Sequence, residues 1–226
     1  MRINLFVLYI ISFLLGGYAF AQDKKIESMT RIEVKNKILD KIKIPDEVTF
    51  YHSNDVDVYA AYDLIVSDSR TEQEQGKTII MGILDAFDYV KKHSGMRKLE
   101  ISFFAREKFF DSMRLLKEKG LMDQEFKRLS DEVINQLNLC EERGPNNRAA
   151  NYAIGALAAA ELYPKHPDMK KWRTYAEAVW NDWYIPGDSY EPAYVAHNVP
   201  RLIALGVRLG KLKELKSEKL KKAYYR

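Results

Sequence analysis

The sequence has little cysteine: Cys140 is the only one among 226 residues. A lone cysteine cannot form an intramolecular disulfide, so the fold must be held by its core, and we expect Cys140 to be a small buried residue in a helical pattern. The chain also lacks the HxxxH and CxxC spacings of zinc sites and has no glycine-rich phosphate loop. We therefore expect no metal ion and no cofactor.

Neither sign of charge dominates the sequence. Lys and Arg total 36 and Asp and Glu total 32, which gives a formal charge of +4. Because the two signs are mixed along the chain, the composition does not indicate a nucleic-acid-binding protein. A mildly basic balance is compatible with an acidic substrate.

No apolar run reaches the roughly 20 residues that a membrane-spanning helix needs. The longest one, Leu5 to Leu15, follows Arg2 and precedes Ala19-Phe20-Ala21, a small-x-small pattern. This order is typical of a secretory signal peptide over residues 1–21, with cleavage between Ala21 and Gln22. We expect the mature chain, residues 22–226, to be periplasmic or secreted, without a membrane partner after cleavage.

Strict alternation of apolar and polar residues is absent, and helical periodicity takes its place. The pattern predicts helices over 24–43, 71–93, 103–119, 123–139, 148–162, 168–183 and 191–209. Residues 46–70 are mixed, although Val58 to Tyr62 could open a helix. The sequence therefore predicts an all-α fold of antiparallel helical hairpins in one domain.

Glycine, proline and asparagine mark several of the expected helix ends. Gly120 suits a C-terminal cap, and Asn146 or Asn147 can cap the following helix. That helix, 148–162, is rich in alanine, so neighbours can approach it closely and we expect it to be central. Pro192 fits a first helical turn, and Pro200 predicts a kink or a break.

Residues 141–206 differ from the rest because polar groups gather at helix ends between aromatic-rich helices. Asn146, Asn147 and Arg148 lie at one expected helix start. A second group surrounds the start of the helix near 191: Asp188, Tyr190, Glu191, Tyr194, His197 and Asn198. Tyr190, Tyr194 and His197 have the spacing i, i+4, i+7, so they share a face if that helix begins early enough.

These motifs carry a family resemblance. The run Asn146-Asn147-Arg148, then W-x-x-Y-A-x-x-V-W-x-D-W, then G-D-S-Y-E-P-x-Y-x-x-H-N resembles the α/α-toroid domain of polysaccharide lyases, of the heparinase II/III-like and alginate-lyase-like kinds. The resemblance covers about residues 103–206. It departs at Arg148, where those enzymes often have a histidine.

The resemblance implies β-elimination of an acidic, uronate-containing polysaccharide. Asn147 and Arg148 would neutralise the uronate carboxylate, which acidifies the neighbouring C5 proton. Tyr190 or Tyr194 would transfer the proton, and His197 would act as a base or contact the carboxylate. Three further residues would bind substrate: Asn146, Glu191 and Trp183.

Each of these residues also has a structural interpretation. Asn147 can be only an N-cap, Tyr194 and His197 can be packing residues, and Trp172, Trp180 and Trp183 share a helical face typical of a core. Asp188 and Glu191 could be a carboxylate pair for glycoside hydrolysis on a helical barrel. A third alternative is a non-catalytic helical glycan-binding module.

The length is short for a whole toroid. About twelve helices at roughly 25 to 30 residues each need more than about 300 residues. The resemblance therefore implies a partial toroid, either truncated or reduced.

Overall fold

The computed structural model describes residues 28–41, 55–93, 101–183, 192–211 and 213–214; for residues 41, 55–56 and 192–198 it describes only the backbone. The described residues form eight α-helices and no strand, so the prediction of an all-α fold is confirmed. The helices are α2 (Arg31–Lys41), α3 (Asp55–Val66), α4 (Arg70–His93), α5 (Arg106–Glu118), α6 (Gln124–Ile134), α7 (Asn147–Leu162), α8 (Met169–Asp182) and α9 (Pro192–Arg208).

The helices belong to two compact units that divide between Asn138 and Leu139. The N-terminal unit contains α2 to α6 and the C-terminal unit contains α7 to α9. None of the helices in the described ranges is long and apolar enough to cross a membrane.

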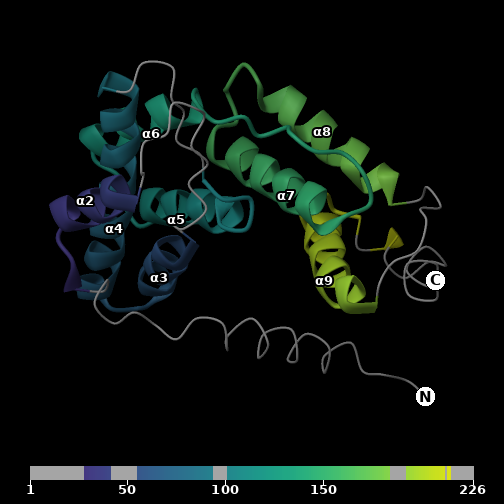
Figure 1. Ribbon diagram of the computed structural model, residues 1–226, viewed down its shortest axis with the longest axis horizontal. Coiled ribbons are helices and arrows are strands. Elements are labelled where there is room, and N and C mark those ends of the chain that lie inside the picture. Colours follow the sequence, from purple (N-terminus) through teal and green to yellow (C-terminus); the bar gives the residue numbers. More distant parts are fainter. Residues whose placement is uncertain (1–27, 42–54, 94–100, 184–191, 212, 215–226) are drawn as a thin grey trace. The chain divides into compact units, whose positions relative to one another are not determined.

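Helix α4 is the centre of the N-terminal unit (Figure 1). It packs against α2, α3, α5 and α6. Its core face carries large apolar side chains, including Ile79, Ile83 and Phe87, all fully buried. Two glycines allow the closest approaches: a Cβ on Gly76 would lie 2.8 Å from the carbonyl oxygen of Ala61 in α3, and one on Gly82 would lie 2.8 Å from that of Arg31 in α2.

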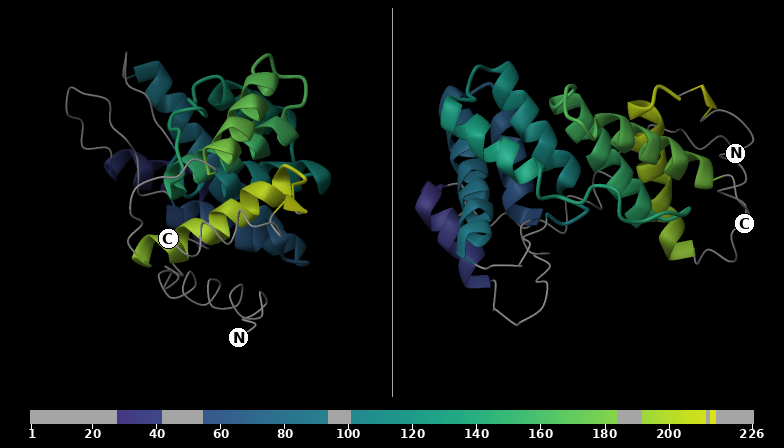
Figure 2. Two further views of the ribbon diagram at one scale, coloured as in Figure 1. Left: turned by 90° about the vertical axis from the view of Figure 1, so that its right-hand side faces the viewer. Right: turned by 90° about the horizontal axis from the view of Figure 1, so that it is seen from above.

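Helix α7 is the centre of the C-terminal unit, as its alanine content predicts. Every residue from Ala149 to Ala160 is buried, and α7 packs against both α8 and α9. The six residues 163–168 join α7 to α8. This connection is too short to let two packed helices of this length run parallel. They therefore lie antiparallel, side by side in Figures 1 and 2, and the first turn of α7 shares one end of the pair with the last turn of α8.

Three expected helix boundaries differ from the structure. Helix α5 begins at Arg106 rather than at residue 103. The other two boundaries are wrong because side chains bond to the backbone nearby. Hydrophobic periodicity predicts a helix from residue 24, but residues 29–30 are not helical. Thr30 and Glu33 form a capping box, in which the Thr30 N–H donates to the Glu33 carboxylate (2.7 Å) and the Glu33 N–H donates to the Thr30 hydroxyl (3.3 Å). This reciprocal pair begins α2 at Arg31.

The other wrong boundary is the end of α6, which stops at Ile134 rather than near 139. The side-chain amides of Asn135 and Gln136 donate to the carbonyl oxygens of Asp131 and Glu132 at 2.7 and 3.0 Å. These bonds satisfy carbonyls of the last turn without a further helical turn. Cys140 therefore lies in a non-helical connection and is only half-buried, which corrects the expectation of a buried helical cysteine.

The glycine and proline expectations have mixed outcomes. Gly120 has a φ of 69°, and the N–H of Leu121 donates to the carbonyl of Leu116 at 2.8 Å, so α5 ends in a Schellman motif at the expected glycine. Pro192 is the first residue of α9, as predicted. Pro200 does not end α9, which continues to Arg208.

Candidate functional site

The connection before α7 is fastened to the end of α8. Arg143 forms a two-point ion pair with Asp182, with Nε–Oδ2 at 2.7 Å and Nη2–Oδ1 at 2.8 Å, and the Gly144 N–H donates to the same carboxylate at 3.0 Å. The Arg143 guanidinium, then the Gly144 N–H, hold the pKa of Asp182 below its ordinary value. The connection before α7 is therefore held in place against the last turn of α8.

Asn146 is the N-cap of α7. Its side-chain oxygen accepts a hydrogen bond from the Ala149 N–H at 2.8 Å, and its backbone is extended, as a cap requires. This assigns to Asn146 the capping role that the sequence left open between Asn146 and Asn147. The side-chain oxygen of Asn146 is used by the Ala149 N–H, which establishes a structural role for this residue. Its predicted role in substrate binding stays untested.

Asn147 and Arg148 follow in the first turn of α7. The half-buried side-chain amide of Asn147 makes no hydrogen bond to the described residues. Arg148 is exposed, and its Nε pairs with the Glu142 carboxylate at 3.0 Å. The first turn of α7 contains no acidic residue, so the partial positive charge of its N-terminus is not offset there.

Trp183 lies at the other side of the same end, as the C-cap of α8. Its side chain is half-buried, and its indole Nε1 is inaccessible to solvent and has no acceptor. Trp172 and Trp180 are 3% and 2% exposed, so for these two the core interpretation is confirmed. Trp183 is the one of the three that remains partly accessible.

The second predicted cluster is described only in part. Tyr190 and Glu191 lie outside the described residues, as does Asp188. Tyr194 and His197 fall in the first turns of α9, but their side chains are not described. The shared face of Tyr190, Tyr194 and His197 therefore stays a prediction.

Sequence reasoning missed Asn151, one turn after Asn147 on the same face of α7. Its side chain is 97% buried, since only 3% is exposed, and its Nδ2 has no hydrogen-bond acceptor. The i, i+4 spacing of two asparagines in a run of alanines is the signal that could have identified it. Asn147 and Asn151 thus place two amide groups along one stripe of the helix.

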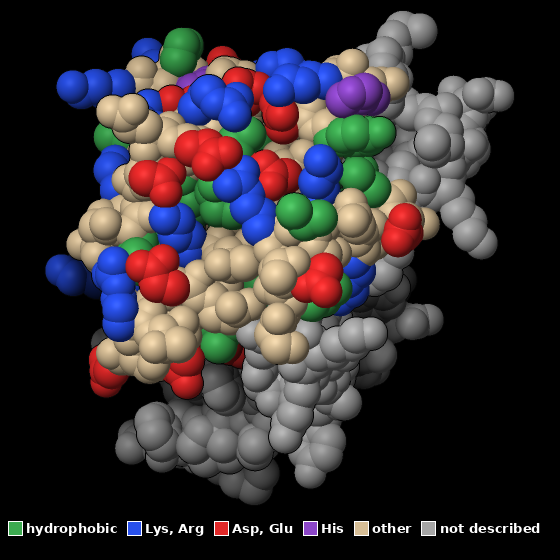
Figure 3. Space-filling model, turned by 90° about the vertical axis from the view of Figure 1, so that its left-hand side faces the viewer, with side chains coloured by type: hydrophobic (Ala, Val, Ile, Leu, Met, Phe, Trp, Pro, Cys, Tyr) green, Lys and Arg blue, Asp and Glu red, His purple; other side chains and the backbone are tan. Residues whose placement is uncertain are grey.

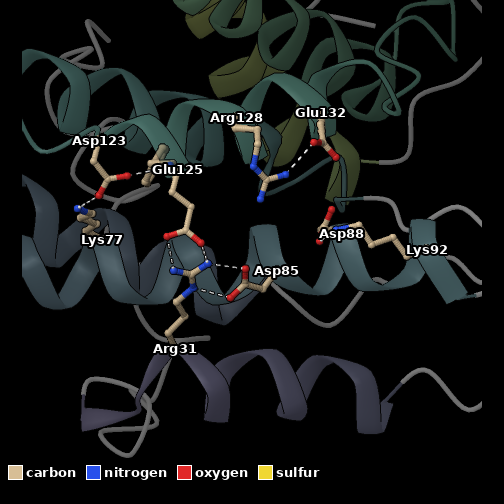
Figure 4. A network of polar contacts seen from close by, with 10 residues as sticks. Arg31, Lys77, Asp85, Asp88, Lys92, Asp123, Glu125, Arg128 and Glu132 are labelled. Carbon is tan, nitrogen blue, oxygen red and sulfur yellow. Dashed lines mark hydrogen bonds and ion pairs between the residues drawn. The ribbon is translucent and has the colours of Figure 1, made fainter.

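A larger polar network lies in the N-terminal unit (Figure 4). Figure 3 shows acidic and basic side chains interspersed over one face of the molecule. Arg31 of α2 binds Asp85 of α4 through Nε (2.5 Å) and Nη2 (2.6 Å), and Glu125 of α6 through Nη1 (3.1 Å) and Nη2 (2.8 Å). The Arg31 guanidinium holds the pKa of Glu125 below its ordinary value, and the carboxylates raise the pKa of Arg31. Because each charged group here has an opposite partner, the network fastens three helices and offers no unpaired reactive group.

No set of His, Cys, Asp and Glu side chains within the described ranges is arranged to hold a metal ion. Comparison with family models, with curated proteins and with solved structures finds no match to this chain. The function of the candidate site therefore has to be inferred from its own residues alone.

Proposed function

We propose that the protein is exported and that its C-terminal unit binds an acidic, uronate-containing polysaccharide. The proposal includes the signal peptide at residues 1–21, a periplasmic or secreted location, and a partial α/α-toroid arrangement of the polysaccharide-lyase type. The binding end is the one where α7 begins and α8 ends. Asn147, Arg148 and Trp183 are its proposed contacts.

The unpartnered donors at this end are the observation that supports the proposal. The Trp183 indole N–H is buried without an acceptor, and the Asn147 amide has no partner among the described residues. Buried polar groups without partners are rare in native proteins, and each one calls for an explanation, of which a bound ligand is one. Polysaccharide hydroxyls and carboxylates are acceptors of this kind. The first turn of α7 contains no acidic residue, so the helix dipole favours the carboxylate there.

Cleavage would follow by β-elimination. Asn147 and Arg148 neutralise the uronate carboxylate, and His197 or an ionised Tyr190 or Tyr194 removes the C5 proton. The electron pair of that C–H bond forms the C4–C5 double bond, the C4–O bond breaks, and a neutral tyrosine protonates the departing oxygen. The products are an unsaturated uronate and a shortened chain, and no water is consumed.

Binding without cleavage is the second candidate, and one observation favours it. Asn146 and Arg148 already have partners in their own chain, a cap and an ion pair with Glu142. Side chains that already bond within the protein are less available to bind the carboxylate of a uronate during elimination. The C-terminal unit would then be a glycan-binding module.

The test uses the purified mature chain, residues 22–226, with alginate, heparin, chondroitin and pectin. Calorimetry measures binding, and the ultraviolet absorbance of the unsaturated uronate measures elimination. Asn147→Ala and Trp183→Phe should each weaken binding about tenfold or more, whereas Asn36→Ala, an exposed helical asparagine in the N-terminal unit, should not. No binding to any of the four glycans contradicts the proposal, and binding without absorbance selects the second candidate.

A further inference from the structure

Four basic side chains gather where α7 is joined to α8, at the end of the pair opposite to Trp183. Between Tyr163 and Thr174 the sequence has four cations and one acid, Asp168. The four cations are Lys165, Lys170, Lys171 and Arg173, and all are exposed. They are called the α8 basic patch below.

The connection holds Lys165 beside the first turn of α8. His166 stacks on Trp172 with ring centroids 4.5 Å apart, and its Nδ1 accepts a hydrogen bond from the Asp168 N–H at 3.1 Å. The His166 N–H in turn donates to the carbonyl of Tyr163 at 3.0 Å. This folded connection leads directly into the first turn of α8. Lys170, Lys171 and Arg173 lie on the solvent-exposed side of that helix, and Lys165 is exposed in the connection before it.

The four basic side chains of the patch have no ion-pair partner within the described residues. None of its four side chains forms an ion pair or a hydrogen bond there. In the same unit Arg143, Arg148, Arg208 and Lys211 each pair with a carboxylate. The patch is therefore a local excess of positive charge on a unit whose other described basic groups are mostly paired.

The position of Lys170 and Lys171 opposes the helix dipole. Both lie in the first turn of α8, where carboxylates are favourable and cations are unfavourable. The first turn contains no acid, and the N-cap Asp168 makes no side-chain capping bond. Asp168 is thus the one acid at this helix start, against two lysines in the first turn. Such an unfavourable local excess of positive charge is expected where an anionic partner offsets it.

We propose that the α8 basic patch is an interaction surface for a linear polyanionic glycan, whose carboxylate or sulfate groups the four cations contact. The inference rests on the proposed function, because it gives the same ligand class a second point of attachment at the far end of α8. That helix has 14 residues, so the two ends lie roughly 20 Å apart along its axis. An extended glycan chain that binds at the Trp183 end of α8 can therefore contact the α8 basic patch at the other end of the helix.

The surroundings of the patch favour a glycan over other polyanions. The large exposed hydrophobic side chains of the described residues are Ile32, Val66, Tyr89, Phe104 and Val207, and none lies between 163 and 174. A membrane-surface helix needs an apolar face to insert, and single-stranded nucleic acid needs exposed rings for stacking. Trp172, the one tryptophan in the patch, is buried under His166.

The experiment compares the mature chain with the fourfold variant Lys165→Gln, Lys170→Gln, Lys171→Gln and Arg173→Gln. A matched variant removes the same charge elsewhere: Lys92→Gln, Lys117→Gln, Lys119→Gln and Lys127→Gln, all in the N-terminal unit. Binding of heparin and alginate is measured from about 50 to about 200 mM NaCl, with dextran as the neutral control. Circular dichroism verifies that both variants fold.

We expect the patch variant to lose at least about tenfold in affinity at the lowest salt, and its dependence of log Kd on log [NaCl] to become shallower by about 2 to 3. The matched variant should stay within about twofold of the unmodified chain. Equal losses in both variants, or unchanged affinity in the patch variant, overturn the inference while the proposed function stands. If the unmodified chain binds no acidic glycan, the proposed function itself fails.

Two further probes decide the class of partner. Vesicles containing an anionic phospholipid and oligo(dT) are offered to the same three proteins. We expect both probes to bind more weakly than heparin. We also expect their binding to be the same for the unmodified chain and the patch variant. Patch-dependent binding of either one, without glycan binding, overturns the inference.

Discussion

At the scale of single residues, the candidate site is defined by which polar side chains already have hydrogen-bond or ion-pair partners inside the protein and which do not. Asn146, Arg148 and Asp182 have partners inside the protein, whereas Asn147, Asn151 and Trp183 keep donors without acceptors among the described residues. The sequence could place asparagine at the start of α7, because capping has a local signature. It could not show the pairing of Arg143 with Asp182, since these residues are 39 positions apart.

Asp182 should make stability depend on pH. Its folded pKa lies below the ordinary value of about 3.9, so its contribution is complete above that value and is lost as the pH falls through the folded pKa. Unfolding by urea should therefore show a stability difference between the unmodified chain and Asp182→Asn that is largest above about pH 5 and shrinks below about pH 4. A difference that is constant over this range would contradict the assignment.

At the scale of helices, boundaries could be predicted where a residue type forces them. The expected helices 71–93, 148–162, 168–183 and 191–209 match α4, α7, α8 and α9 within two residues. The ends of α2 and α6 could not be predicted, because apolar periodicity continues past them while Thr30, Glu33, Asn135 and Gln136 bond to the backbone. Local hydrogen bonds decided these ends.

Gly82→Ala should destabilise the N-terminal unit although alanine is the better helix former. The new Cβ would lie 2.6 Å from the Val34 Cβ and 2.8 Å from the Arg31 carbonyl oxygen, so α2 must shift away from α4. We expect a loss of about 1 to 3 kcal/mol, which exceeds the gain of about 1 kcal/mol in helix propensity. Thr78→Ala in the same helix is the control, with a change within about 1 kcal/mol; equal stability of Gly82→Ala would show that the helices can separate freely.

At the scale of the whole molecule, the described helices form two units, each with its own central helix. The sequence marks no boundary between Asn138 and Leu139, because residues 136–140 contain no glycine or proline and read as a continuation of the preceding pattern. Helical periodicity reports which face is buried, but not against which helix. The division therefore became apparent only in the packing.

Two separate cores should respond separately to damage. In Gly82→Ala, hydrogen exchange followed by mass spectrometry on the full chain should accelerate in peptides from α2, α3 and α4. Peptides from α7 and α8 should exchange at the rates of the unmodified chain, because the packing partners of these helices lie within the C-terminal unit, away from residue 82. Acceleration of equal size in all these helices would show that the units unfold as one.

The clamp made by Arg31 sets an order of assembly for the N-terminal unit. Arg31 and Glu125 are 94 positions apart, so the guanidinium is synthesised long before its last partner. Helices α2 and α4 can meet first through Asp85, but α6 must emerge and dock before the clamp is complete. Once α2 and α4 have met, the loop left to close runs from Asp85 to Glu125, and its entropy is lost before the Glu125 contacts form. The Arg31 side chain thus gains its last partner only when α6 has docked.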